Sequence, residues 1–396
     1  MEPAMLLSEL PAELLQHIAS YIPATHIALA FAPTCRALRK AARNALNDIS
    51  LLAVTSTTAN SVVLLYIDGS VVIEWDAKPP RRIKTRSGGW ATGIACGEDM
   101  SLHVGQYSAH GLLTFALPRD VRRAEHARAG YSYERSIQTA PSPEGVVCAH
   151  GIVYSVGIDP NGFSSVWRHT LAGTEVEKRV LPAEFEAWGI GCAAALWGIG
   201  LTPANDFLLI AAHESDNPAS DEPTRENTGR VLAVGISRES GSFEHDPVAV
   251  RDWDAAGLSM PPLNRPSDLA CCSHGYLFVA SFSGYAFDRK RVIYKLALSE
   301  DRTMGGKVCC FALPDDYMAH GLCTCPQGNV IYATAHRGGL AHRGGLGVKV
   351  DSAIFSFACG CNDAGEHAEV PRATKLADLP GAHCIAHVPC VSAREK

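Results

Sequence analysis

The sequence predicts a mainly β protein in which a small three-helix domain, residues 6–48, precedes a C-terminal β-propeller, residues 49–396. Two observations carry this prediction. The chain holds 35 glycines, yet none occurs before Gly69, and the first fifty residues are rich in alanine. Alanine is the strongest helix former and glycine among the weakest. From about residue 51 an apolar β pattern then recurs at intervals of about 50 to 70 residues, a period typical of propeller blades.

Composition excludes several classes of protein. Apolar residues make up 47% and charged residues 19% of the chain, which excludes a disordered protein. The net charge of −6 lacks the basic excess of a nucleic-acid binder. Glu2 and Glu9 stand where a secretory signal would be basic, so we expect a cytoplasmic or nuclear protein with reduced thiols. The uncharged run 187–205 is broken by glycines and Pro203, so it predicts buried strands and no membrane span.

The predicted helices share an apolar character. The first begins near Pro11, and Leu14 and Ile18 lie on one face of it before Pro23 ends it. A second follows Thr25, and a third covers residues 35–46. About forty residues cannot bury enough apolar surface to be stable alone, so this domain must pack on the propeller or on a partner.

The same stretch resembles the F-box. The resemblance rests on Leu10-Pro11-x-Glu13-Leu14-Leu15-x-x-Ile18, followed by Ile27-x-Leu29-Ala30 and Cys35-Arg36-x-Leu38. It implies docking on the Skp-type adaptor of a cullin–RING ubiquitin ligase. The apolar positions that would make this contact are Leu10, Pro11, Leu14, Ile18, Ile22 and Leu29.

The β pattern consists of a leading Gly or Asp, an apolar strand, a polar turn and a second apolar strand. The leaders are Gly93, Gly145, Gly198, Asp268 and Gly321. Residues 383–388 are predicted to form the first strand of a unit, but no second or third strand follows it. The predicted strands 51–54, 62–66 and 70–75 have no such first strand before them. Together they complete one blade, so we expect six blades, or seven if the long interval before Asp268 hides another. The pattern is similar to NHL-type and gluconolactonase-like propellers.

The cysteines give no reason to expect a metal or any other cofactor. None of the 14 cysteines forms a C-x-x-C pair. The one cluster is His383-Cys384-x-x-His387-x-x-Cys390. Alternation along a strand would place His383 and His387 on one face and the two cysteines on the other, so the segment predicts an ordinary strand.

Loop residues are the candidates for binding another protein. An acidic insertion covers residues 214–226, and Ala335-His336-Arg337-Gly338-Gly339-Leu340 is repeated at once as residues 341–346. Aromatic residues and arginine dominate protein-binding hot spots. The candidate target-binding residues are Trp90, Tyr107, Tyr285, Arg337 and Arg343.

No catalytic motif occurs, neither G-x-S-x-G nor a phosphate loop nor H-E-x-x-H. The expected function is therefore a non-catalytic substrate receptor that binds the adaptor, and through it a cullin, while its propeller binds an unidentified target protein. Two alternatives stay open: a propeller scaffold capped by its own helices, and a metal-dependent lactonase-like hydrolase. The hydrolase would draw its ligands from Asp68, Asn205, Asp206, Asp268 and Asp351.

Overall fold

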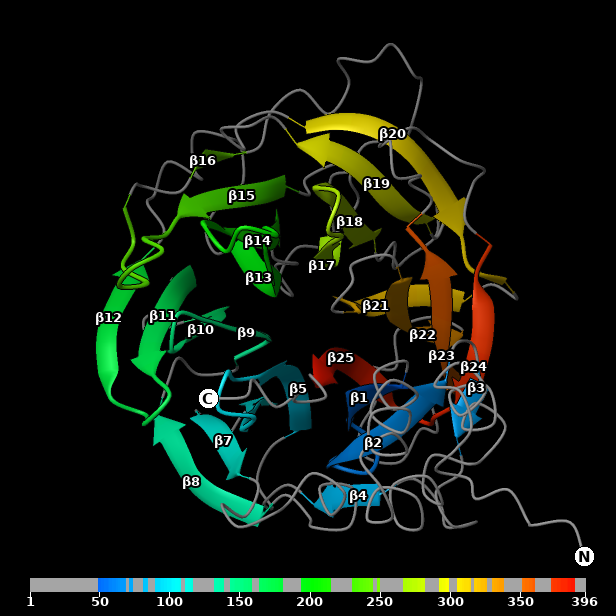
Figure 1. Ribbon diagram of the computed structural model, residues 1–396, viewed down its shortest axis with the longest axis horizontal. Helices are drawn as coiled ribbons and strands as arrows, with labels where there is room; N and C mark the ends of the chain where they lie inside the picture. Colours follow the sequence, from blue (N-terminus) through cyan, green and yellow to red (C-terminus); the bar gives the residue numbers. More distant parts are fainter. Residues whose placement is uncertain are drawn as a thin grey trace, which may run out of the picture.

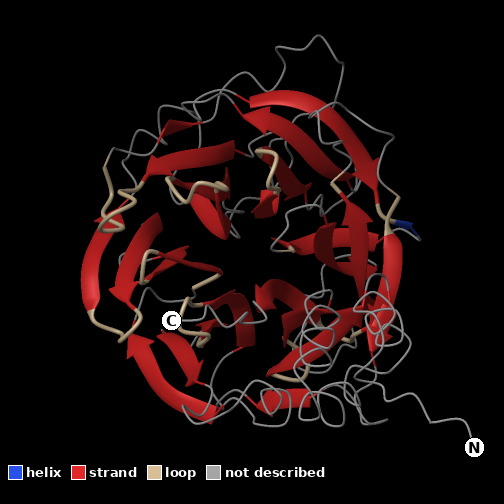
Figure 2. Cartoon of the chain, viewed as in Figure 1, coloured by secondary structure: helices blue, strands red, loops and turns tan. Residues whose placement is uncertain are grey.

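The computed structural model describes residues 49–388 with internal gaps. The gaps are 69–70, 74–80, 85–89, 108–110, 117–131, 139–142, 159–163, 181–193, 215–229, 245–247, 250–265, 282–291, 299–304, 315–316, 326–329, 338–350 and 360–371. The predicted helical domain, residues 6–48, lies outside the described residues. Strands dominate the described part (Figure 2). No described helix is long and apolar enough to cross a bilayer.

The strands form six antiparallel sheets, the blades, five of which follow the chain in order. Blade 1 is β5 (Trp90–Cys96), β6 (Leu102–Tyr107), β7 (Gly111–Ala116) and β8 (Ser132–Gln138); blade 2 is β9 (Gly145–Ala149), β10 (Ile152–Ile158), β11 (Ser164–Thr170) and β12 (Glu175–Val180); blade 3 is β13 (Ala194–Leu201), β14 (Phe207–Glu214), β15 (Arg230–Gly235) and β16 (Val248–Ala249). Blade 4 is β17 (Pro266–Cys271), β18 (Tyr276–Ser281), β19 (Val292–Leu298) and β20 (Gly305–Ala312); blade 5 is β21 (Tyr317–Thr324), β22 (Val330–Arg337), β23 (Asp351–Ala358) and β24 (Thr374–Asp378).

The sixth sheet, the seam blade, closes the ring. It joins β25 (Ala382–Val388) to β1 (Ile49–Ser56), β2 (Ser61–Asp68), β3 (Val71–Ile73) and β4 (Arg81–Lys84). Strand β25 pairs antiparallel with β1, so Leu51 lies opposite Val388 and Val54 opposite Ile385. The prediction of six blades is confirmed, and one blade is shared by distant parts of the chain as the sequence indicates. Figure 1 shows the six inner strands, β5, β9, β13, β17, β21 and β25, around the centre of the ring.

Six apolar clusters hold the described ring together, one at each junction between neighbouring blades. Tyr154 of β10 and Leu208 of β14 belong to the cluster between blades 2 and 3, for example. Equivalent clusters occupy the other five junctions. Each fully buried aliphatic or aromatic side chain contributes about 1.5–3 kcal/mol. Because both faces of every blade are covered only by neighbouring blades, the sheets are stable as a closed ring.

A break in register recurs at one level of the ring. It interrupts the pairing of five of the six inner strands: β5 between Ala91 and Ile94, β13 between Leu196 and Ile199, β17 between Pro266 and Asp268, β21 between Ala319 and Gly321, and β25 between Ala382 and Ile385. At each break the inner strand has one residue more than its partner, which is a β-bulge, and a β-bulge changes the direction of the neighbouring side chains. The bulges therefore turn residues next to the leaders of the sequence pattern toward the channel or the joints between blades.

Hydroxyl side chains join neighbouring inner strands at the same level. Thr55 Oγ1 donates to the Thr92 carbonyl (2.8 Å) and accepts from the Cys384 N–H (2.9 Å). Thr92 Oγ1 donates to the Pro143 carbonyl (2.6 Å). Thr334 Oγ1 accepts from the Gly321 N–H (2.9 Å) and donates to the carbonyl of His383. These hydrogen bonds satisfy backbone groups that the bulges leave without a strand partner.

The two faces of the ring are defined by the direction of the inner strands. We call the face at which the inner strands begin the start face, and the face at which they end the finish face. Because neighbouring strands are antiparallel, the second strand of each blade ends at the start face and the third begins there. The segments that link second to third strands, including 282–291 and 338–350, therefore connect strand ends that lie at the start face.

Candidate functional site

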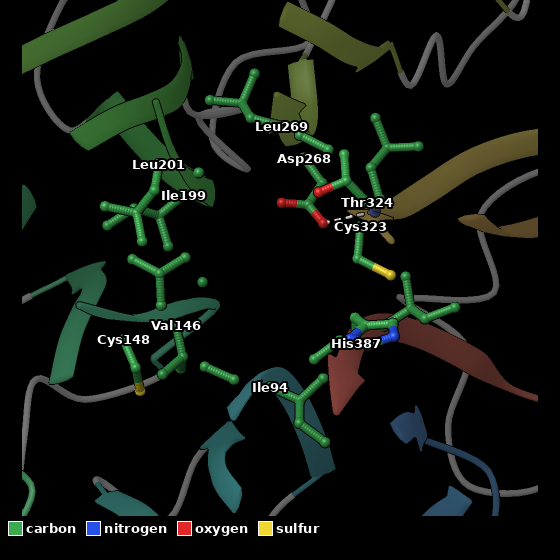
Figure 3. A pocket seen from close by; sticks show the side chains of 18 of the residues that line it. Ile94, Val146, Cys148, Ile199, Leu201, Asp268, Leu269, Cys323, Thr324 and His387 are labelled. Atoms are coloured by element: carbon green, nitrogen blue, oxygen red, sulfur yellow. Dashed lines mark hydrogen bonds between the residues drawn. The ribbon is translucent and has the colours of Figure 1, made fainter. Parts of the chain in front are cut away.

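The channel at the centre of the ring contains a cavity of about 310 Å³, lined by all six inner strands. Its wall has two chemically different halves. The side chains of Ile94, Val146, Ile199 and Leu201 form an apolar half, contributed by β5, β9 and β13 (Figure 3). Asp268, Cys323 and His387 form a polar half, contributed by β17, β21 and β25.

Asp268 is the central carboxylate of the polar half. Its Oδ2 accepts the backbone N–H of Leu322 on the next inner strand (2.8 Å). Burial raises the pKa of this carboxyl from 3.8 to about 7, and backbone hydrogen bonds from Leu322 and Leu269 oppose that shift in part. A Cβ at Gly198 would lie 2.4 Å from Asp268 Cα, so glycine is required for β13 and β17 to approach this closely.

A second carboxyl lies near the start face. Glu144, just before β9, places its Oε2 3.9 Å from Nε2 of His383 on β25, and 20% of its side chain is exposed. Burial raises the pKa of Glu144 from 4.5 to about 8. Two carboxyls with pKa values near neutrality in one channel can donate or accept protons at physiological pH.

The thiols of the channel stay protonated. Burial raises the pKa of Cys148, Cys323 and Cys384 well above the usual range, with a smaller effect of the Asp268 and Glu144 carboxylates on Cys384. Burial also lowers the pKa of His387 to about 4, so its imidazole is neutral at pH 7. Since the thiolate is the nucleophile, no metal-free cysteine chemistry is expected here.

Two groups of His and Cys side chains converge among the described residues. In the first, which we call the seam cluster, the ligand atoms of His320, His383 and Cys384 all lie within 4.8 Å of one another. In the second, the turn cluster, Cys272, His274 and Cys359 converge, and Cys359 Sγ lies 3.8 Å from His274 Nδ1. His274 is exposed, whereas His320 and His383 are buried.

Residues 383–388 belong to a strand, as expected. Cys384 packs with Ala386 and Val388 on the blade 1 side of it, whereas Ile385 packs on the blade 5 side. The bulge between Ala382 and Ile385 nevertheless brings the ligand atoms of His383 and Cys384 within 4.8 Å of each other, and His383 is buried against His320 with ring centroids 3.9 Å apart. Cys390 lies outside the described residues.

The candidate target-binding residues that the structure describes belong to the start face. Trp90 begins β5 and lies directly opposite Tyr107, which ends β6. Arg337 ends β22, is exposed, and lies 3.9 Å from the carboxylate of Asp351. Tyr285 and Arg343 lie outside the described residues, as do the adaptor-binding candidates Leu10, Pro11, Leu14, Ile18, Ile22 and Leu29.

The oxygen ligands considered for a lactonase-like metal do not gather in one place. Of the five, Asp268 presents its carboxylate to the cavity, and Asn205 lines its finish end. Asp206 binds Thr202 and Arg238, and exposed Asp351 contacts Arg337 and Tyr317. The side chain of Asp68, at the end of β2, is not described.

Sequence reasoning missed Glu144 and His320. Both stand immediately before a leader glycine, Gly145 and Gly321, and His383 holds the matching place before Cys384. A comparison of the residue that precedes each leader would have picked out these side chains.

Comparison with known proteins shows no family for this chain. The described fold is a six-bladed β-propeller. No protein-family model matches the sequence, and no curated protein matches it. Among solved structures, a Lactobacillus plantarum protein is 14% identical, with a TM-score of 0.47, over 85% of this chain and 98% of its own. A Bacteroides uniformis protein, proposed in its description to be a 6-phosphogluconolactonase, is 10% identical, with a TM-score of 0.49, over 86% and 100%. A Xanthomonas campestris gluconolactonase is 13% identical, with a TM-score of 0.40, over 73% and 84%.

Proposed function

We propose that the protein is a substrate receptor of a cullin–RING ubiquitin ligase. Its N-terminal segment binds a Skp-type adaptor, and the start face of its propeller binds the target protein. The chain makes and breaks no bond in this role; it raises the effective concentration of the target near the ligase. Such ligases act in the cytoplasm and nucleus, which is where the protein is expected.

The observation that carries the proposal is the segment Leu10–Ile18, L-P-A-E-L-L-Q-H-I, placed shortly before a propeller. In the sequence this segment precedes β1, which begins at Ile49 and pairs with β25 to close the described ring. The described strands form a complete hydrogen-bonded ring from residue 49 onward.

Adaptor capture by the full chain tests the proposal. Recombinant Skp-type adaptor should retain the wild type and lose Leu14→Asp/Ile18→Asp, because charges at these positions would have to be buried in the contact. Thr374→Asp, at an exposed position of β24, adds a charge away from this segment and should be retained like the wild type. Equal retention of wild type and double variant, or retention of neither, would refute the adaptor role.

Hydrolysis in the channel is a second candidate, favoured by the two buried carboxyls Glu144 and Asp268. Their pKa values of about 8 and about 7 suit a general acid and a general base. Lactone hydrolysis that needs a divalent metal and is lost in Asp268→Asn would establish this activity. Absence of turnover across a panel of lactones would count against it.

A further inference from the structure

We propose that the seam cluster, His320, His383 and Cys384, binds a divalent metal ion of the zinc class at the joint between blade 5 and the seam blade. Two imidazoles and one thiolate form a donor set that prefers zinc to magnesium or calcium. The three ligand atoms already lie within 4.8 Å of one another. In a tetrahedral zinc site these separations are about 3.3–3.8 Å, so the side chains need to approach by about 1.5 Å at most.

The backbone places these three residues together. His320 occupies the bulge of β21, and His383 and Cys384 occupy the bulge of β25. The second bulge lets two consecutive residues contribute to one site, which a regular strand would not allow. The positions are therefore set by backbone irregularities in two adjacent inner strands.

The two strands approach one another closely at this point. A Cβ at Gly321 would lie 2.7 Å from the carbonyl oxygen of His383 and 2.8 Å from Cys384 Cα. Thr334 joins the same two strands, because it accepts from Gly321 and donates to His383. The site is thus held on rigid elements, as a preformed metal site requires.

The surroundings suit a dication with one open coordination position. Cys384 lines the channel cavity, so the ion can be reached from the channel. Glu144 Oε2, 3.9 Å from His383 Nε2, is a further oxygen donor beside the site. The Cys384 thiolate formed when the metal binds offsets one of its two positive charges, which a buried cation needs. His336 packs edge-on against His320, with ring centroids 5.2 Å apart, and its Nδ1 contacts Ser352 Oγ at 2.9 Å.

Metal at this place would strengthen the closure of the ring. The ligands come from β21 and β25, so the ion links blade 5 to the strand that completes the seam blade. A ligand that binds only the folded protein multiplies the folding equilibrium constant by one plus the ratio of its free concentration to its dissociation constant. Free zinc at about 100 times its dissociation constant should lower the unfolded fraction about 100-fold. This consequence holds whether or not the protein binds an adaptor.

Cobalt titration of the chelator-treated full-length protein tests the proposal. Co²⁺ in a tetrahedral site with a thiolate gives visible d–d bands and a sulfur-to-cobalt charge-transfer band in the near ultraviolet. The wild type should show both bands, saturating at a single ion per chain. Zinc should abolish the bands and raise the melting temperature. Cys384→Ser should lose the charge-transfer band, and His320→Gln should weaken binding at least about tenfold.

The turn cluster provides the matched control. His274→Gln removes a histidine from the other group of converging His and Cys side chains and should leave the spectrum unchanged. Loss of the bands in His274→Gln, with their retention in Cys384→Ser, would assign the metal to the turn cluster and overturn the proposal. Absence of cobalt bands in the wild type would overturn it as well. Circular dichroism identifies any variant that fails to fold, and His383→Asn then replaces it.

Discussion

Substitution of Asp268 by asparagine should flatten the pH dependence of stability. The carboxyl has a pKa of about 7 in the folded protein against 3.8 as its ordinary value. Because the folded state holds the proton more tightly than the unfolded chain, stability falls as pH rises from about 4 to about 7 and is constant above that. Asparagine keeps an acceptor for the Leu322 N–H and removes the charge.

The magnitude follows from the shift. One pKa unit corresponds to about 1.36 kcal/mol, so a shift of about 3 units corresponds to about 4 kcal/mol over the whole range. Between about pH 5 and about pH 8, about 3 kcal/mol of this should be lost by the wild type and kept by Asp268→Asn. The raised pKa of Glu144 acts in the same direction over an overlapping range.

Urea denaturation followed by tryptophan fluorescence measures the effect. The comparison is best made in a Glu144→Gln background, with and without Asp268→Asn, in the presence of chelator so that bound metal does not alter either carboxyl. The free energy of unfolding is determined at both pH values. If both proteins lose the same free energy of unfolding between about pH 5 and about pH 8, within about 0.5 kcal/mol, the Asp268 carboxyl does not bind its proton more tightly in the folded protein. That result would refute the reasoning.

Three further predictions concern the inner strands. Gly198→Ala should destabilise by about 1–3 kcal/mol, because its Cβ would lie 2.4 Å from Asp268 Cα, and a melting temperature equal to that of the wild type would contradict this. Thr334→Val should cost about 1–3 kcal/mol in urea denaturation, since the backbone groups of Gly321 and His383 lose their shared partner; an unchanged midpoint would argue against that bridge. His387 has a pKa of about 4 in the folded protein, so as pH falls below about 6.5 the unfolded chain binds a proton that the folded protein does not, and the folded state loses stability. In thermal melts, the melting temperature of His387→Leu should therefore fall less toward pH 4 than that of the wild type. An equal fall in both proteins would exclude the effect.

The blade count was predictable because it depends on local signals. The leaders Gly93, Gly198 and Gly321 stand at the start of apolar runs, and a Cβ at each of them would lie 2.4–2.7 Å from a backbone atom of another blade. The split blade was predictable for a similar reason. A strand without partners at 383–388 and strands without a leader near 51–75 complete one another.

The channel chemistry was not predictable in the same way. His320 and His383 lie far apart in the sequence and meet only because closure places β21 beside β25. Cys384 joins them through an extra residue in the strand, and a strict two-residue alternation has no place for such an insertion. Asp268 was considered because an aspartate precedes a strand, but its burial depends on Gly198 in a different blade. Convergence of this kind is a property of the whole ring.

The pairing of β25 with β1 also has a consequence for biosynthesis. Strand β1 leaves the ribosome early, but its partner β25 extends to Val388. The ring therefore stays open until all the blades between them have been synthesised. During this wait two unpaired strand edges are available for contacts with other chains. A nonsense codon shortly before Ala382 would leave the nascent product permanently open, and we expect cellular quality control to remove it although most of its sheets are intact.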